Sequence, residues 1–227
     1  TNLPPTVEVD GPYITLINNG ILITAVASDP EGKELTYDWD LGADGSIDWT
    51  TTDPTFWFDD VDTTGITAIA VQVTDIGGLT ASDETVVIVY DPNGLFVTGG
   101  GWINAPDGKG EFSFDAKYVK RNPYPVAVVT YTVASSGLTF TGASYDWLVV
   151  DGRYSWLHGT GAFNGVAGYT FLLSAEDGSE KLGGNGIDTF RLQIWDASGV
   201  LVYDTEPGAW QYAVPLTPLG GGSITVH

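Results

Sequence analysis

Acidic side chains suited to binding a metal ion gather in residues 36–49, which read TYDWDLGADGSIDW. Asp40, Asp44 and Asp48 are spaced four residues apart, and the glycines between them permit a bend. Calcium takes about six to eight oxygen ligands from carboxylates, carbonyls and water, so this segment predicts a calcium site. The spacing is not that of an EF-hand, because position 42 is glycine. The alternative is that these carboxylates cap turns by accepting hydrogen bonds from backbone amides.

A second group of oxygen-bearing side chains lies in glycine-rich turns of the second half. Asp177 and Asp188 flank a loop that contains Asn185, and Asp196 ends the segment that follows. Adjacent strands bring loop ends together, so this group also predicts a structural calcium ion. The alternative is that these side chains are solvated and belong only to their turns.

Aromatic side chains of the second half suggest sugar binding, because a flat ring can stack on the apolar face of a sugar. The candidate stacking platform consists of Tyr154, Trp156, His158, Trp210 and Tyr212.

The first half holds further aromatic residues. Trp39 shares one face of a predicted strand with Tyr37, so we expect it in the core. Trp49, Trp57 and Phe58 form either an exposed stacking strip or part of a core, and packing is the favoured interpretation.

Catalytic machinery is hard to assemble from this sequence. There are two histidines, no cysteines and no Gly-x-Ser-x-Gly elbow. A serine triad would need His158 with Asp146 or Asp151, and a glycosidase pair depends on the separation of two carboxylates in space. Most acids lie in turns, where capping is their usual role. We therefore expect a protein that is not an enzyme.

Composition limits the fold and the partners. The 227 residues suffice for two domains, and 43% hydrophobic residues can build real cores. Thirty glycines and 12 prolines suit short strands and turns better than long helices. The net charge of −21 repels nucleic acid and anionic lipid, and it concentrates divalent cations. The absence of cysteine excludes disulfides, and no apolar run reaches membrane-spanning length.

The first half, residues 1–91, predicts about seven short strands, which is typical of an immunoglobulin-like sandwich. Residues 28–32 (SDPEG), 35–42 (LTYDWDLG) and 70–78 (AVQVTDIGG) resemble the motifs of the polycystic kidney disease (PKD) domain family. The resemblance implies a β-sandwich spacer or binding module beside other extracellular domains. It also implies calcium ligands near the first motif, although glutamate stands there in place of the family's aspartate. The implied ligands are Asn2, Ser28, Asp29 and Glu31.

The second half, residues 92–227, predicts a jelly-roll-like antiparallel sandwich of about eight to ten strands. Residues 97–103 (VTGGGWI), 144–150 (SYDWLVV) and 186–191 (GIDTFR), with the ending 219–224 (LGGGSI), resemble the post-COAP-1 type of domain. That domain type occurs at the ends of bacterial surface proteins, so the resemblance implies a location and no particular chemistry. Arg191 lies among apolar neighbours in a predicted strand, and we expect it to pair with a carboxylate.

These patterns predict an all-β protein made of two β-sandwich domains in tandem. We expect a non-catalytic, calcium-stabilised extracellular module for cell-surface display, adhesion or binding. The alternative is a carbohydrate-binding appendage of a larger secreted hydrolase. The expected partners are neighbouring domains of a longer secreted precursor and a cell-surface glycan or protein. Nucleic acid binding and membrane insertion of this segment are not expected.

Overall fold

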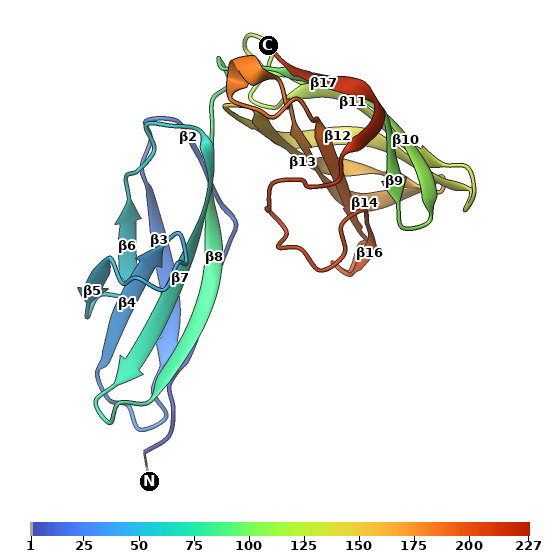
Figure 1. The fold of residues 1–227 in the computed structure, drawn as a ribbon. Coiled ribbons are helices and arrows are strands. Elements are labelled where there is room, and N and C mark those ends of the chain that lie inside the picture. Colours follow the sequence, from blue (N-terminus) through green and yellow to red (C-terminus); the bar gives the residue numbers. More distant parts are fainter. Residues whose placement is uncertain (1) are drawn as a thin grey trace. The chain divides into compact units, whose positions relative to one another are not determined.

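The structure is a computed structural model that describes residues 2–227, and it consists of strands joined by turns (Figure 1). Within that range the one helical element is the 3-10 helix η1 (Glu180–Leu182). The chain divides into two compact units between Tyr90 and Asp91. The predicted all-β class is therefore confirmed. No helix of the described residues is long and apolar enough to cross a membrane.

The first unit is a sandwich of two sheets. The three-stranded sheet has the order β1 (Thr6–Val9), β3 (Ile21–Ser28), β6 (Thr55–Phe58). The five-stranded sheet has the order β2 (Tyr13–Leu16), β8 (Thr80–Tyr90), β7 (Gly65–Asp75), β4 (Leu35–Leu41), β5 (Trp49–Thr51). β2 runs parallel to β8, whereas the other pairs are antiparallel. Two facing sheets, with the consecutive strands β1 and β2 in different sheets, give the predicted immunoglobulin-like architecture.

Strand periodicity explains the core of the first unit. Ile69, Val71 and Val73 alternate along β7, and all three are fully buried. Trp39 on β4 is also fully buried, and its ring stacks on Phe56 of the opposite sheet at a centroid distance of 5.6 Å. The prediction that Trp39 anchors the core is therefore confirmed.

The second unit is built on one nine-stranded sheet. Its spatial order is β16-β15-β14-β13-β12-β11-β10-β9-β17, and every pair is antiparallel. The strands are β9 (Val97–Ala105), β10 (Gly108–Lys117), β11 (Val126–Val133), β12 (Leu138–Asp151), β13 (Tyr154–Phe163), β14 (Val166–Glu176), β15 (Thr189–Trp195), β16 (Leu201–Asp204) and β17 (Leu219–Val226).

This up-and-down order differs from the expected jelly-roll topology. The physical reason lies in the turns. Only two residues separate the successive strands at three of these turns, which are residues 106–107, 152–153 and 164–165. A two-residue connection makes consecutive strands antiparallel neighbours. A jelly roll would need long connections that carry the chain to a second sheet. The long connection 205–218 joins β16 to β17, which pairs with β9 at the far end of the strand order.

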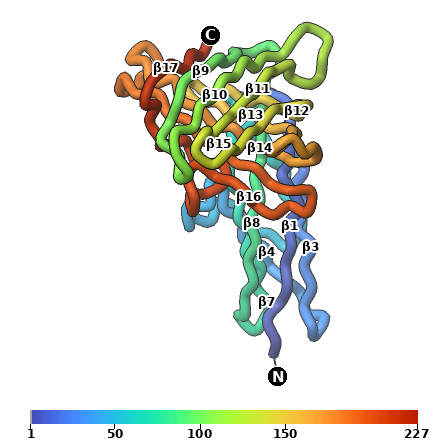
Figure 2. Tube along the Cα trace, turned by 90° about the vertical axis from the view of Figure 1, so that its right-hand side faces the viewer, coloured from blue at the N-terminus to red at the C-terminus, as the bar shows by residue number. Residues whose placement is uncertain are grey.

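The nine-stranded sheet curls until its ends approach each other. Figure 2 shows β17 beside β9, and the segment before β17 also reaches β15 through a bridge between Thr189 and Pro218. The curled sheet encloses one core, in which Phe112 of β10 and Phe190 of β15 stack at 4.0 Å between ring centroids. We call the junction of β15 and β17 the seam.

Candidate functional site

Residues 205–218 form a loop of the second unit that is held by many hydrogen bonds, and we call it the strap. Its anchor is Arg191 on β15, which is fully buried. The guanidinium donates to both carboxylate oxygens of Asp204, at 3.0 Å from Nε to Oδ1 and 2.8 Å from Nη2 to Oδ2. The expectation that Arg191 pairs with a carboxylate is confirmed, and the bidentate geometry fixes the guanidinium plane.

The remaining donors of Arg191 hold the strap backbone. Nη1 donates to the carbonyl of Trp210 at 2.7 Å, and Nη2 donates to the carbonyl of Ala209 at 3.2 Å. Gln193, two residues further along β15, donates its amide nitrogen to the Gln211 carbonyl at 2.8 Å when the amide is oriented to satisfy both of its groups. Three consecutive strap carbonyls are therefore fixed by β15.

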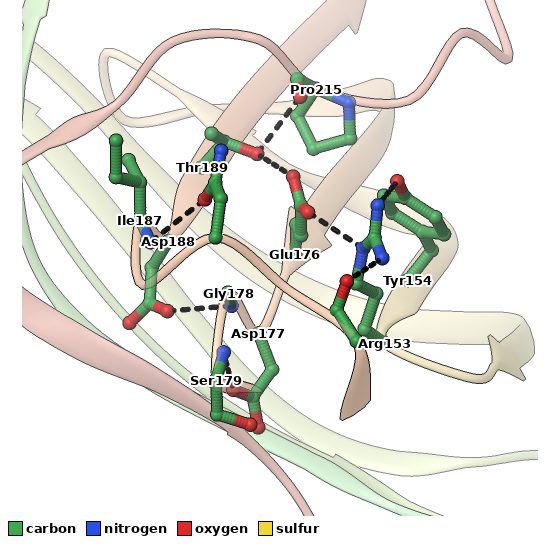
Figure 3. A network of polar contacts seen from close by, with 12 residues as sticks. Arg153, Tyr154, Glu176, Asp177, Gly178, Ser179, Ile187, Asp188, Thr189 and Pro215 are labelled. Carbon is green, nitrogen blue, oxygen red and sulfur yellow. Dashed lines mark hydrogen bonds and ion pairs between the residues drawn. The ribbon is translucent and has the colours of Figure 1, made fainter. Parts of the chain in front are cut away.

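The returning part of the strap is also anchored. Glu206 Oε1 accepts hydrogen bonds from the amides of Leu216 and Thr217 at 2.7 and 2.6 Å. The hydroxyl of Thr189 donates to the Pro215 carbonyl at 2.8 Å (Figure 3). Polar contacts at both ends give the strap a defined conformation.

The fixed strap presents two aromatic side chains. Trp210 is 49% exposed, and its ring meets Tyr212 edge to face at a centroid distance of 5.5 Å. Tyr212 is partly buried, and burial raises the pKa of its hydroxyl above the ordinary value, so the ring carries no charge at neutral pH. The pair offers a rigid, uncharged aromatic surface.

The other members of the predicted platform are placed differently. Trp156 is only 5% exposed. It pairs with Ser174 on the next strand, and Ser174 pairs with Arg191, so these three residues share the outward face of the sheet. The strap attaches to this face at Arg191. Tyr154 is engaged by Arg153, whose Nη2 donates to the tyrosine oxygen at 2.6 Å. The expectation of one platform of five rings is therefore corrected. Trp156 offers no exposed face, His158 stacks on Trp147, and only Trp210 and Tyr212 lie together on the strap.

Two predicted calcium ligands instead close the seam. Asp188 accepts a hydrogen bond from the amide of Gly178 at 2.8 Å (Figure 3). It also accepts one from the amide of Ile224 at 2.7 Å. Asp177 accepts from the amide of Val226 at 2.9 Å. β17 is an edge strand, so its outward amides need partners, and these two carboxylates supply them. Burial would raise the pKa of Asp177, but hydrogen bonds from backbone amides lower it, which keeps this acceptor ionised.

The predicted calcium group of the second unit does not assemble. Asp188 and Asp196 stand at opposite ends of the seven-residue strand β15, which separates them by roughly 25 Å. Asn185 accepts a hydrogen bond from the Ile187 amide, and Asp196 accepts from the Ser198 amide, both within their own turns. The capping alternative describes these side chains.

The acidic group of residues 40–48 also caps its own turn. Asp40 accepts from the amides of Asp44 and Gly45 at 3.1 and 2.7 Å. Asp48 accepts from the Leu41 amide at 2.7 Å, and Asp44 accepts from Ser46. Among residues 2–227 no group of three or more histidine, aspartate or glutamate side chains is arranged to hold a metal ion. These contacts are those of the capping alternative, and the calcium site expected here stays a prediction.

One acidic group of the first unit retains an unused ligand atom. Asp29 is 8% exposed, and its Oδ1 accepts hydrogen bonds from the amides of Glu31 and Lys33 at 2.9 and 2.8 Å. Its Oδ2 has no hydrogen-bond partner. A buried carboxylate oxygen without a partner fits a cation, because it would otherwise remain desolvated at a cost of about 1–3 kcal/mol.

Leu3 and Asn2 contact two separate acidic side chains of the first unit. The Leu3 amide donates to Glu31 Oε2 at 3.3 Å, and Asn2 Nδ2 donates to Asp75 Oδ2 at 2.7 Å. Asp75 was not among the predicted residues, although it opens the Asp-Ile-Gly-Gly turn that signals a hairpin. Ser28 is exposed, and its carbonyl accepts a hydrogen bond from the Thr6 hydroxyl.

A histidine and a carboxylate lie together on the outer face of the second unit. His158 Nδ1 is 2.8 Å from Asp146 Oδ2, and the imidazole stacks on Trp147 at 5.4 Å between ring centroids. Burial lowers the pKa of His158, and the Asp146 carboxylate opposes this by raising it. Among the described residues, the hydrogen-bond partner of this ring is Asp146, and no hydrogen bond joins the ring to a serine hydroxyl. The serine triad considered from the sequence is therefore not assembled.

The aromatic residues of the first unit separate into two groups. Phe58 is fully buried, whereas Trp49 and Trp57 are each more than half exposed. The favoured packing interpretation therefore holds for Phe58 and is wrong for the two tryptophans.

Comparisons with known proteins give distant likenesses. No family model and no curated protein matches the chain. One similar structure comes from a study of the promiscuous specificity of carbohydrate-binding modules of the β-sandwich superfamily, with 12% identity over 100% of this chain and 96% of that one and a TM-score of 0.37. Another is the Bacteroides ovatus mixed-linkage glucan utilization locus protein SGBP-B bound to a mixed-linkage heptasaccharide, with 10% identity, 88% and 67% coverage and a TM-score of 0.31. Likenesses at this level carry no argument, and the resemblances to PKD and post-COAP-1 domains stay predictions.

Proposed function

We propose that this chain is a non-catalytic, extracellular glycan-binding module, and that the strap of the second unit carries its binding site. The observation that carries the proposal is Trp210, a half-exposed indole on a loop whose backbone is fixed by the buried Arg191–Asp204 pair. This is the alternative that the sequence offered, with the site reduced to Trp210 and Tyr212.

The geometry suits sugar rings for a physical reason. The apolar face of a pyranose packs on a flat aromatic ring, and the gain is largest when the ring does not have to be ordered on binding. Arg191 and Gln193 order the strap before any ligand arrives. A net charge of −21 disfavours anionic ligands, so neutral polysaccharides are the proposed ligand class.

The surroundings of such a module follow from the composition. The chain has no cysteine and therefore no disulfides. Its two hydrophobic cores supply the stability that such a module needs outside a cell. The proposed partners are a polysaccharide and the neighbouring domains of a longer secreted or surface-attached protein.

The test is affinity gel electrophoresis of the full chain in gels that contain mixed-linkage β-glucan, arabinoxylan or galactomannan. We expect retardation by at least one polysaccharide, and Trp210→Ala should weaken it by about tenfold, the effect of roughly 1.4 kcal/mol. Leu216→Ala is the matched control, because Leu216 is an exposed apolar residue of the same strap.

If the wild type is retarded by a polysaccharide and Trp210→Ala is retarded equally, the binding site does not lie on the strap. A wild type that binds none of the polysaccharides, at millimolar oligosaccharide as well, would refute the proposed function.

A second proposal concerns calcium in the first unit, and the unpartnered Oδ2 of buried Asp29 favours it. Glu31 is the neighbouring acid, because its amide donates to Asp29 Oδ1 and its own carboxylate accepts from the Leu3 amide. A cation bound there would stabilise the first unit, because a ligand that binds only the folded state adds stability in proportion to the logarithm of its concentration. The chain would then also serve as a calcium-stabilised spacer in surface display or adhesion.

The calcium proposal predicts a melting temperature that rises between chelator and millimolar calcium. A stabilisation of about 2.7 kcal/mol follows when calcium exceeds its dissociation constant 100-fold. Asp29→Asn should abolish the difference, whereas Asp40→Asn should retain it, because both oxygens of Asp40 already serve backbone amides. Equal melting temperatures with chelator and calcium would exclude the site.

A further inference from the structure

We propose that the first unit carries a second glycan-stacking surface, formed by the indole of Trp57, so that the chain is bivalent for neutral polysaccharides. The inference rests on the proposed function, because it assigns the same class of ligand to a second and independent place. We call this surface the Trp57 platform, and it consists of Trp57, Gly20 and Leu22.

The exposure of Trp57 follows from strand alternation. Trp57 lies between Phe56 and Phe58 on β6, and Phe58 is fully buried. Alternate side chains of a strand point to opposite faces, so burying Phe58 turns the indole outward. Trp57 is 57% exposed. A large flat apolar side chain is thus offered to solvent on the outer face of the three-stranded sheet.

The indole ring of Trp57 packs against the backbone at Gly20. A Cβ atom added at Gly20 would lie 2.7 Å from Cζ2 and 2.9 Å from Cε2 and Nε1 of the Trp57 ring. These distances are shorter than any ordinary contact, so the ring lies directly against the backbone at residue 20. Backing by the main chain restricts the indole before binding, which reduces the entropy lost when a ligand stacks on it.

The surroundings of the indole combine an apolar neighbour with hydroxyls. Leu22 lies directly opposite Trp57 across β3 and β6, and it is also exposed. Thr24 and Thr55 form the next pair on the same face, and Thr24 is exposed. A sugar needs this combination, since its ring face is apolar and its edge carries hydroxyl groups. The second exposed indole of the first unit, Trp49, lies on the neighbouring strand in sequence, β5.

Charge decides which occupant fits. Residues 1–90 hold one lysine and no arginine against 16 aspartates and glutamates. A second copy of the chain would bring the same negative field to the contact, and anionic polysaccharides, lipids and nucleic acids would also be repelled. A neutral glycan meets no such repulsion and matches the flat apolar ring. Two sites on one chain would further strengthen binding to a polymer through effective concentration.

The test is isothermal titration calorimetry of the full chain with a soluble oligosaccharide of the polysaccharide that the wild type binds in gels. We expect two sites per chain in the wild type and one site in each of Trp57→Ala and Trp210→Ala. Gly20→Ala should act like Trp57→Ala, because the new methyl group displaces the indole from the backbone at residue 20. Ile76→Ala, which truncates an exposed apolar residue of a hairpin, is the control and should keep both sites.

On the intact polysaccharide, Trp57→Ala should weaken retardation by about three- to tenfold, since avidity is lost together with one stacking contact. A wild type with one site that Trp57→Ala leaves intact would overturn the Trp57 platform and leave the strap site standing. One site that is lost only with Trp57 would support the platform and refute the strap. A wild type that binds no polysaccharide would refute both.

Discussion

The buried ion pair that anchors the strap gives the most demanding prediction. Asp204→Asn keeps the size and shape of the side chain but removes the negative charge that balances Arg191. Both residues are buried, and the guanidinium lies 2.8 Å from the carboxylate. Asparagine would also turn amide hydrogens toward a donor-only guanidinium, since one of its two terminal groups is itself a donor. A charged side chain without a counter-charge would remain inside the folded unit.

The magnitude follows from the burial of the pair. Removing one partner of a buried ion pair destabilises a protein by about 3–5 kcal/mol, because the remaining charge is left uncompensated. The second unit comprises residues 91–227, so its entropy of unfolding near the midpoint is about 0.3 kcal/mol/K. The melting temperature of this unit should therefore fall by about 10–17 °C.

Differential scanning calorimetry measures this change, and limited proteolysis with mass spectrometry locates it. Cleavage within residues 205–218 should become faster, because Arg191 also binds the carbonyls of Ala209 and Trp210. The matched control is Glu111→Gln, which removes a carboxylate from an exposed ion pair with Lys109. An exposed pair contributes about 0–1 kcal/mol, so the control should shift the melting temperature by less than about 3 °C.

A double variant separates loss of charge balance from loss of packing. Arg191→Met with Asp204→Leu removes both charges, and it should recover much of the stability that the single substitution removes. If Asp204→Asn melts within error of Glu111→Gln, the pair is not the anchor of the strap and this reasoning is wrong.

Two further predictions concern the seam and the histidine. Asp188→Ala leaves the amides of Gly178 and Ile224 without their partner, so the free energy of unfolding should fall by roughly 2–4 kcal/mol in a urea titration. Asp115→Ala, which removes an exposed carboxylate, is the control. Equal urea midpoints for the two variants would contradict a role of Asp188 in closing the seam. For His158, burial lowers the folded-state pKa below the ordinary value, so the unfolded chain binds the proton first as the pH falls. Its contribution to stability is complete above about pH 6.5 and is lost as the pH falls through the folded-state pKa. His158→Gln should reduce the drop in melting temperature between about pH 7.5 and 5, and an unchanged drop would exclude this source.

The sequence by itself determined the class of fold and much of the packing. The spacing of Tyr37 and Trp39 predicted a strand with a buried face, and Trp39 is in the core. This signal is local, because the pleat of a strand sends neighbouring side chains to opposite faces whatever surrounds them. The apolar setting of Arg191 likewise predicted a carboxylate partner, since a buried charge needs one.

Only the tertiary structure decided which side chains remain available. Trp156 and Trp210 look alike in sequence, yet the first is buried where the strap attaches and the second is exposed on the strap. Asp188 looked like a metal ligand, but the curling of the sheet places the amide of Ile224 on its carboxylate. The physical reason is common to both cases: a local pattern fixes the face of the sheet to which a side chain points, whereas the segment that covers that face, or hydrogen-bonds there, comes from tens of residues away.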